Sequence, residues 1–205
     1  MEFVKDFATF LHENGIIKFG DFTLASGKKS PYYVDLRLLP SYPHEFRKTI
    51  KYLQNLISEE IGFDNFHSLV SVPTGGLVFA SALATEIVKP LCYVRNTPKD
   101  HGTVKLIEGV ICQDMKMLMI DDVITTGGSV INAISKIKES KLQISNAFVI
   151  IDRLEGAGKS LESQGVKLHS ILDIRRIVQI LHEQDRVNED LVVQIENQLN
   201  TSLNE

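Results

Sequence analysis

One short segment places two acids between an apolar strand and a turn rich in hydroxyls and glycines. It reads Met117-Leu-Met-Ile-Asp121-Asp122-Val-Ile-Thr-Thr-Gly-Gly-Ser129. In an open α/β sheet, ligands bind beyond the carboxyl ends of the strands, so we expect Asp121 and Asp122 there as acceptors for sugar hydroxyls or a metal ion. The glycines let the backbone approach a ligand, and the amides at the start of the next helix favour a phosphate. The segment therefore predicts one site for a ribose and its phosphate.

A simpler interpretation of the segment is that Asp122 or a threonine caps the helix and that the glycines form a tight turn. A run of consecutive residues, 117–129, that all suit one ligand argues against it. Two other phosphate-binding motifs are disfavoured, because the segment has neither the Gly-Lys-Ser/Thr ending of a P-loop nor a Gly-x-Gly-x-x-Gly fingerprint.

The segment resembles the signature that binds phosphoribosyl diphosphate (PRPP) in the type I phosphoribosyltransferases. Val72-Pro-Thr-Gly-Gly76 is similar to the turn that binds the diphosphate in that family. The resemblance implies an α/β fold of the type I phosphoribosyltransferase class, with a small hood formed largely by the N-terminal segment over a mostly parallel sheet. The PRPP-binding residues that it implies in these two segments are Thr74, Gly75, Asp121, Asp122, Val123, Ile124, Thr125, Thr126, Gly127, Gly128 and Ser129.

Three further segments resemble the orotate phosphoribosyltransferases within that family. They are Phe19-Gly-Asp-Phe-Thr-Leu-Ala-Ser-Gly-Lys-Lys-Ser-Pro-Tyr-Tyr-Val-Asp35, Arg95 with Lys99-Asp-His-Gly102, and Asp152-Arg-Leu-Glu-Gly156. The resemblance implies transfer of the phosphoribosyl group from PRPP to orotate, which gives orotidine monophosphate and diphosphate in pyrimidine (UMP) biosynthesis. It also implies Mg²⁺ as the cofactor, held mainly by PRPP, and we assign no protein ligand to the metal.

Orotate is a planar ring with a carboxylate, and the donor fork of an arginine fits a carboxylate bidentately. The resemblance therefore implies Arg153 as the anchor of that carboxylate. The orotate-binding set is Tyr32, Tyr33, Thr125 and Arg153. The alternative for Arg153 is a surface ion pair with Asp152 or Glu155, and the alternative for the tyrosines is packing in a half-buried strand.

The stretch from Arg95 to Gly109 is rich in charge and lacks an apolar period, which predicts a loop. As a mobile lid, it would bring Arg95, Lys99 and His101 onto the diphosphate, neutralise the leaving group and exclude water. Lys99 and His101 are also candidate acids for the leaving oxygen, so they join the two aspartates in the catalytic set. The alternative is a solvated charged hairpin. In the family this loop reaches into the neighbouring subunit's site, which implies a homodimer with shared active sites.

Three positions depart from the pattern common in the family. Ala25, Gly75 and Asn96 stand where many members carry a basic residue, and Lys28, Lys29 and Lys105 are the candidate substitutes. Each departure removes a contact to the diphosphate. We therefore expect weaker or more salt-sensitive binding of PRPP.

Two other functions suit parts of the pattern: a phosphoribosyltransferase for another base such as xanthine, and a PRPP-sensing regulator without catalysis. A net charge of −4, from 22 basic and 26 acidic residues, argues against nucleic-acid or membrane partners. The two cysteines, Cys92 and Cys112, lie in apolar runs and are expected to be reduced thiols that fill the core of a cytoplasmic protein. The sequence leaves open an association with the decarboxylase that consumes orotidine monophosphate.

Short apolar runs separated by helical patterns predict the elements that position these residues. Expected strands are Phe19–Leu24, Tyr32–Leu36, Leu69–Val72, Leu91–Val94, Met117–Ile120, Phe148–Ile151 and Leu168–Leu172. Expected helices run from Phe3 to Leu11, from Pro43 to Ile57, and over Leu77–Val88, Val130–Lys138, Ile174–Leu181 and Leu191–Leu199. We expect one domain, with the N-terminal helix and hood in residues 1–40, the core sheet and its helices in 41–172, and C-terminal helices that pack on their own subunit in 173–205.

Overall fold

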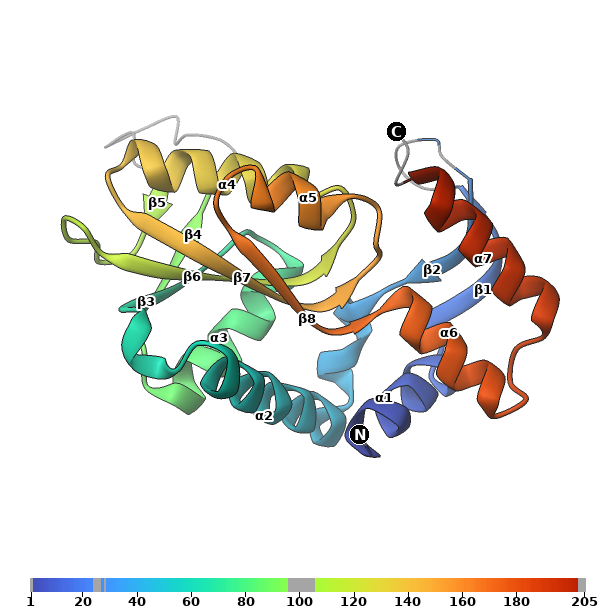
Figure 1. Ribbon diagram of the computed structural model, residues 1–205. Coiled ribbons are helices and arrows are strands. Elements are labelled where there is room, and N and C mark those ends of the chain that lie inside the picture. The colour runs from blue at the N-terminus through green and yellow to red at the C-terminus, as the bar shows by residue number, and fades with distance from the viewer. Residues whose placement is uncertain (1, 24–26, 28, 96–105, 203–205) are drawn as a thin grey trace.

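The centre of the computed structural model, which describes residues 2–23, 27, 29–95 and 106–202, is a six-stranded sheet in the order β5-β4-β3-β6-β7-β8 (Figure 1). All neighbouring strands are parallel except β5, which runs antiparallel to β4. The strands are β3 (Ser68–Ser71), β4 (Leu91–Val94), β5 (Ile107–Glu108), β6 (Lys116–Ile124), β7 (Gln143–Asp152) and β8 (Lys167–Asp173). The predicted α/β fold with a mostly parallel sheet is confirmed.

Helices cover both faces of this sheet. On one face lie α2 (Pro43–Glu60) and α3 (Gly75–Ile87), and on the other lie α4 (Gly128–Glu139) and α5 (Ala157–Glu162) (Figure 1). Alternate residues of β6 supply the two faces: Leu118 and Ile120 pack into one hydrophobic cluster, and Met117 and Met119 pack into the other. Both sets are buried because successive side chains of a strand point to opposite faces. This explains why the strands are continuously apolar.

A smaller unit stands beyond the right-hand end of the sheet in Figure 1. It contains the antiparallel pair β1 (Ile17–Thr23) and β2 (Lys29–Val34), with α1 (Glu2–Glu13), α6 (Ile174–Glu183) and α7 (Glu189–Ser202). Helix α1 packs against α6, and α7 packs against β2. The apolar stripes of α6 and α7, which include Ile177, Leu181, Ile195 and Leu199, are buried within the chain. Packing of the C-terminal helices on their own subunit is confirmed, and they join the N-terminal segment in the hood.

Several element predictions need correction. The acids of the signature do not follow the strand, because β6 continues to Ile124 through pairing with β7. Helix α5 was not predicted, and neither were the short 3-10 helices Leu36–Ser41 and Phe63–Asn65. The C-terminal end of the stretch predicted as a loop forms β5, so that Tyr93 and Val94 pair with Glu108 and Ile107. The segments on either side of residues 96–105 are therefore paired as antiparallel strands, while residues 96–105 themselves lie outside the described part of the chain.

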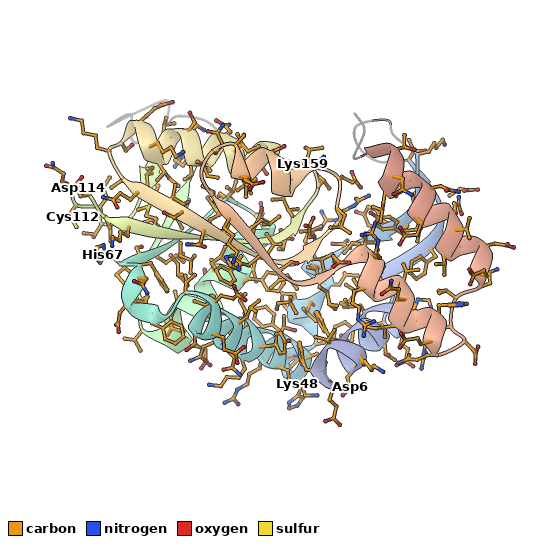
Figure 2. The ribbon with its side chains drawn as sticks, in the orientation of Figure 1. Asp6, Lys48, His67, Cys112, Asp114 and Lys159 are labelled. Carbon is orange, nitrogen blue, oxygen red and sulfur yellow. The ribbon has the colours of Figure 1, made fainter. Side chains whose placement is uncertain are left out.

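The two cysteines differ in their surroundings. Cys92 is buried in β4, as predicted, whereas Cys112 is exposed in the turn between β5 and β6, so its assignment to the core is wrong. Figure 2 shows Cys112 beside Asp114 and near His67, at the left-hand edge of the molecule. The parallel strands β3, β4, β6, β7 and β8 begin toward this edge and end toward the hood (Figure 1). Among the described residues, no helix is both long and apolar enough to span a membrane.

Val88 combines two unfavourable features at the C-terminal end of α3. It has a left-handed backbone (φ 53°, ψ 49°) and its side chain is 88% exposed. A β-branched residue is strained in this conformation, which glycine adopts freely. We expect Val88→Gly to raise the free energy of unfolding by about 1 kcal/mol.

Urea denaturation measures this change. Val193→Gly is the matched control, because Val193 is also exposed but lies inside α7, where glycine is expected to lower stability. Equal effects of the two substitutions would contradict strain at Val88.

Candidate functional site

The ends of three neighbouring strands bring most of the predicted site residues to one edge of the sheet. Thr74 and Gly75 follow β3, Asp121 and Asp122 lie in the last part of β6, and Arg153 follows β7. Because β6 lies between β3 and β7, these groups face a common region. The hood stands at the same edge (Figure 1).

Asp121 is the more buried of the two acids. One of its oxygens accepts a hydrogen bond from the backbone N–H of Asp122 at 3.0 Å. Burial and the neighbouring charge of Asp122 raise the pKa of the Asp121 carboxyl well above its ordinary value. Nearby, the hydroxyl of Ser71 is buried and has no hydrogen-bond partner in the part of the chain that the structure describes. The site therefore holds a desolvated acid next to a half-buried one.

The turn after β3 packs directly against both acids. A Cβ atom on Gly75 would lie 2.6 Å from Cγ of Asp122, and one on Gly76 would lie 2.8 Å from Cα of Asp121. Any side chain at Gly75 would therefore collide with the present position of the Asp122 carboxylate. This steric restriction explains why glycine stands at position 75, where some members of the family carry lysine, and the sequence alone did not show it.

The signature turn leads into α4 without a side-chain cap. Gly127 occupies the cap position with φ 82°, and among the described residues no side chain forms a cap hydrogen bond with the first turn of the helix. The interpretation in which Asp122 or a threonine caps the helix is therefore wrong. A Cβ atom on Gly127 would lie 2.9 Å from Cδ1 of Leu161, so α5 also restricts this position to glycine. The uncapped amides remain available to an anion.

Not every signature residue can use its side chain on a ligand. Ile124 is buried in the core, and its carbonyl accepts a hydrogen bond from the N–H of Arg153 at 3.0 Å. Val123 packs against the other hydrophobic cluster. Thr126, Gly128 and Ser129 are exposed, and Thr125 is half-buried.

Arg153 lies in a buried cluster that joins the core to the hood. Its Nη2 forms an ion pair with Glu155 at 2.8 Å, and only 7% of each side chain is exposed. Its Nε donates to the hydroxyl of Tyr32 at 3.2 Å, and Nη2 also lies 3.4 Å from the hydroxyl of Ser30. The alternative prediction, a surface ion pair of Arg153 with Asp152 or Glu155, was therefore right about Glu155 as a partner but wrong about the surface, because the pair is buried.

The two candidate tyrosines point to different surroundings. Tyr32 is fully buried, and its ring lies 4.7 Å from the guanidinium carbon of Arg153. The hydroxyl of Tyr33 instead accepts from Nη2 of Arg37 at 3.2 Å, and its ring lies 5.8 Å from that of Phe22. The alternation of strand β2 thus brings only Tyr32 to Arg153.

Arg95 marks the start of the stretch predicted as a lid. Its guanidinium forms an ion pair with Glu108 at 3.2 Å, and its backbone N–H donates to Leu106 at 2.8 Å. Lys136 of α4 donates to the carbonyl of Arg95 at 3.1 Å. Lys99 and His101 lie outside the described residues, so their predicted roles stay predictions.

Comparisons with known proteins agree on one family. Residues 41–166 match the family model for the phosphoribosyl transferase domain. An orotate phosphoribosyltransferase of Cenarchaeum symbiosum is 47% identical over 196 residues, which cover 96% of this chain and 98% of that protein. A second one, of Staphylothermus marinus, is 39% identical and covers 93% of this chain and 91% of that protein. The chain belongs to the orotate phosphoribosyltransferase family.

Solved structures support this assignment to the orotate phosphoribosyltransferase family. The crystal structure of orotate phosphoribosyltransferase from Aeropyrum pernix is 33% identical, with a TM-score of 0.74 over 88% of this chain and 99% of that one. The UMP synthase of Leishmania donovani is 26% identical, with a TM-score of 0.82 over 96% of this chain. This chain spans 42% of that longer protein.

Sequence reasoning assigned no binding or catalytic role to Ser30, Ser71 and Glu155. Ser30 and Glu155 lie inside segments that carry the family resemblance, so the signal was present without a role attached. Ser71 carries no sequence signal, because its importance depends on the turn that packs over it. Of the candidate substitutes for the missing basic residues, Lys29 donates to Thr23 at 2.8 Å, whereas Lys28 and Lys105 lie outside the described residues.

Proposed function

We propose that the edge formed by β3, β6 and β7 binds PRPP and that Arg153 holds orotate beside it. Members of the orotate phosphoribosyltransferase family transfer the phosphoribosyl group of PRPP to orotate, in pyrimidine biosynthesis. The observation that supports this site best is a buried arginine, Arg153, at the end of β7. This strand is the neighbour of β6, which carries the two carboxylates. An arginine suits the carboxylate of the base, and aspartates suit the hydroxyls of the ribose.

The protein catalyses this reaction by orienting the two substrates and by stabilising the charges that develop on the ribose and the leaving diphosphate. Binding both substrates together turns a bimolecular displacement into a step within one complex. The uncapped start of α4 receives the 5-phosphate, and the turn at Thr74 and Gly75 receives the diphosphate. The negative charge of Asp121 and Asp122 stabilises positive charge that develops on the ribose as the bond to diphosphate lengthens. The charge of the leaving diphosphate is neutralised by Arg95, Lys99 and His101, and Lys99 or His101 donates a proton to the leaving oxygen.

The residues of this site fit a Mg²⁺ ion that binds together with PRPP and is held mainly by its diphosphate. Magnesium usually keeps several waters and binds one or two carboxylates together with substrate phosphates. The half-buried carboxylate of Asp122 is the protein group that would face it, while the described residues contain no cluster of three acidic, histidine or cysteine ligands. When bound, Mg²⁺ would neutralise charge on the diphosphate.

Three further properties belong to the same proposal. We propose a homodimer whose subunits share active sites, a cytoplasmic location, and an association with orotidine monophosphate decarboxylase. Sedimentation with and without that decarboxylase measures both associations. A monomer at every protein concentration would contradict the shared sites.

The decisive experiment follows the loss of orotate in a mixture of protein, Mg²⁺ and PRPP. We expect turnover with orotate and little with xanthine or other purines. We expect the double variant Asp121→Asn, Asp122→Asn to lose most of this activity. Unchanged activity in that variant would overturn the assigned site. PRPP binding without turnover of any base would instead support a regulator.

A further inference from the structure

The cluster around Arg153 is a closed ring of hydrogen bonds. Arg153 donates through Nε to the hydroxyl of Tyr32 at 3.2 Å and pairs through Nη2 with Glu155 at 2.8 Å. The hydroxyl of Tyr32 closes the ring by donating to the same oxygen of Glu155 at 3.4 Å. The ring joins β2 of the hood to the segment that follows β7.

The direction of each hydrogen bond is determined by chemistry. An arginine can only donate and a carboxylate can only accept, so the tyrosine must accept from Arg153 and donate to Glu155. Burial raises the pKa of Tyr32 to about 12, so this hydroxyl keeps the proton that it donates. The ring thus has one arrangement of protons at neutral pH.

This arrangement fixes the plane of the guanidinium. Nε and Nη2 have partners in the ring, and the Tyr32 ring lies 4.7 Å from the guanidinium carbon. Among the described residues, none forms a hydrogen bond or an ion pair with Nη1 of Arg153. Because Nη2 donates to Ser30 as well as to Glu155, a guanidinium held at Nε and Nη2 presents the two N–H groups of Nη1 as its remaining donors, in one direction.

We propose that Glu155 is a positioning residue that, through its ion pair with Arg153 and its hydrogen bond with Tyr32, aims Arg153 at the carboxylate of a planar base. The inference deepens the proposed function and rests on it. Buried ion pairs contribute little net stability, and a role in fixing one geometry is a recognised reason for their presence. Selectivity for a base with a carboxylate then depends on Glu155, although Glu155 is itself an anion.

Steady-state kinetics of Glu155→Gln and Tyr32→Phe test this role. Gln keeps an acceptor for Nη2 but removes the charge, and Phe keeps the ring but removes the hydroxyl. We expect each substitution to raise the KM for orotate about ten-fold and to leave the KM for PRPP within about two-fold, because only the base anchor is loosened. The ratio of kcat/KM for orotate to that for uracil, which lacks the carboxylate, should fall.

Two controls separate positioning from a merely structural effect. Glu60→Gln removes an acid that pairs with Lys167 at 3.3 Å near the opposite edge of the sheet, and Tyr52→Phe removes a hydroxyl from α2. We expect neither control to change the ratio between orotate and uracil. An unchanged or lower KM for orotate in Glu155→Gln would overturn the proposal, since a lower value would mean that Glu155 competes with the substrate.

Arg153→Lys distinguishes this inference from the proposed function. If Arg153→Lys leaves the KM for orotate unchanged, the anchor itself is wrong and the proposed binding site fails. If Arg153→Lys raises that KM while Glu155→Gln and Tyr32→Phe leave it unchanged, only the positioning role fails.

Discussion

Asp121→Asn is expected to lower kcat by about 10²- to 10³-fold while it raises the free energy of unfolding at neutral pH. The loss of activity follows because the carboxylate charge that stabilises the ribose in the transition state is removed. The gain in stability follows because a buried carboxylate beside Asp122 is costly to ionise. Asn keeps the oxygen that accepts from the N–H of Asp122. Activity and stability therefore change in opposite directions, which is the usual trade-off at an active site.

The gain in stability should depend on pH in one direction. The pKa of Asp121 is raised in the folded protein, so the folded state binds its proton more tightly than the unfolded state does. Stability of the parent protein therefore falls as pH rises from the ordinary range of an aspartate, about pH 4, through the raised pKa. Asn cannot ionise, so its advantage should be full above that raised pKa and vanish below about pH 4.

Thermal unfolding across a pH series, together with kcat, measures both effects. Asp114→Asn is the matched control, since Asp114 is exposed at the edge of the molecule far from the hood (Figure 2). It makes the same change of side chain and should alter neither kcat nor the pH dependence. A variant at Asp121 that is less stable than the parent at neutral pH would contradict the argument.

The sequence was sufficient for the elements whose pattern depends on burial. The apolar runs of β3, β4, β6, β7 and β8 were recognisable because both faces of the sheet are covered by helices. Short elements were missed for the opposite reason. Strand β5 has only two residues, and α5 has six, so neither offers a period long enough to detect.

The candidate site was predictable where chemistry lies in consecutive residues. The acids and the signature turn lie next to each other in the chain, so their common ligand could be inferred from order alone. The ring around Arg153 could not be inferred in this way, because Tyr32 and Arg153 are 121 residues apart and meet only in the folded chain, where β2 packs beside the end of β7. The exposure of Cys112 was mispredicted because an apolar neighbourhood in sequence does not guarantee burial in a turn.

Steric fit was the part of the site that residue types did not reveal. A missing lysine at Gly75 was interpreted as a lost contact to the diphosphate. The structure adds that the space beside Gly75 is filled by the carboxylate of Asp122. The absence of a lysine at position 75 and the close packing of Asp122 against that position therefore depend on each other.

Alanine substitutions at the two neighbouring glycines are expected to have different effects for this reason. In Gly75→Ala the new methyl group meets a short side chain, which can rotate away, so we expect a large loss of kcat/KM with little change in stability. In Gly76→Ala it meets the backbone, 2.8 Å from Cα of Asp121, and also the buried hydroxyl of Ser71 at 2.9 Å. Backbone cannot move without disturbing β6, so we expect a loss of about 2 kcal/mol in the free energy of unfolding.

Urea denaturation and kinetics of both variants separate these effects. Gly158→Ala is the control, because it lies in α5 with nothing within 4 Å of the added Cβ, and alanine there should slightly raise stability and leave kcat/KM unchanged. Restoring a lysine at Gly75 should likewise lower activity, since the lysine Cβ meets the same carboxylate before its charge can reach the diphosphate. If that lysine variant instead binds PRPP more tightly and turns over faster, the position of Asp122 against Gly75 does not limit the site.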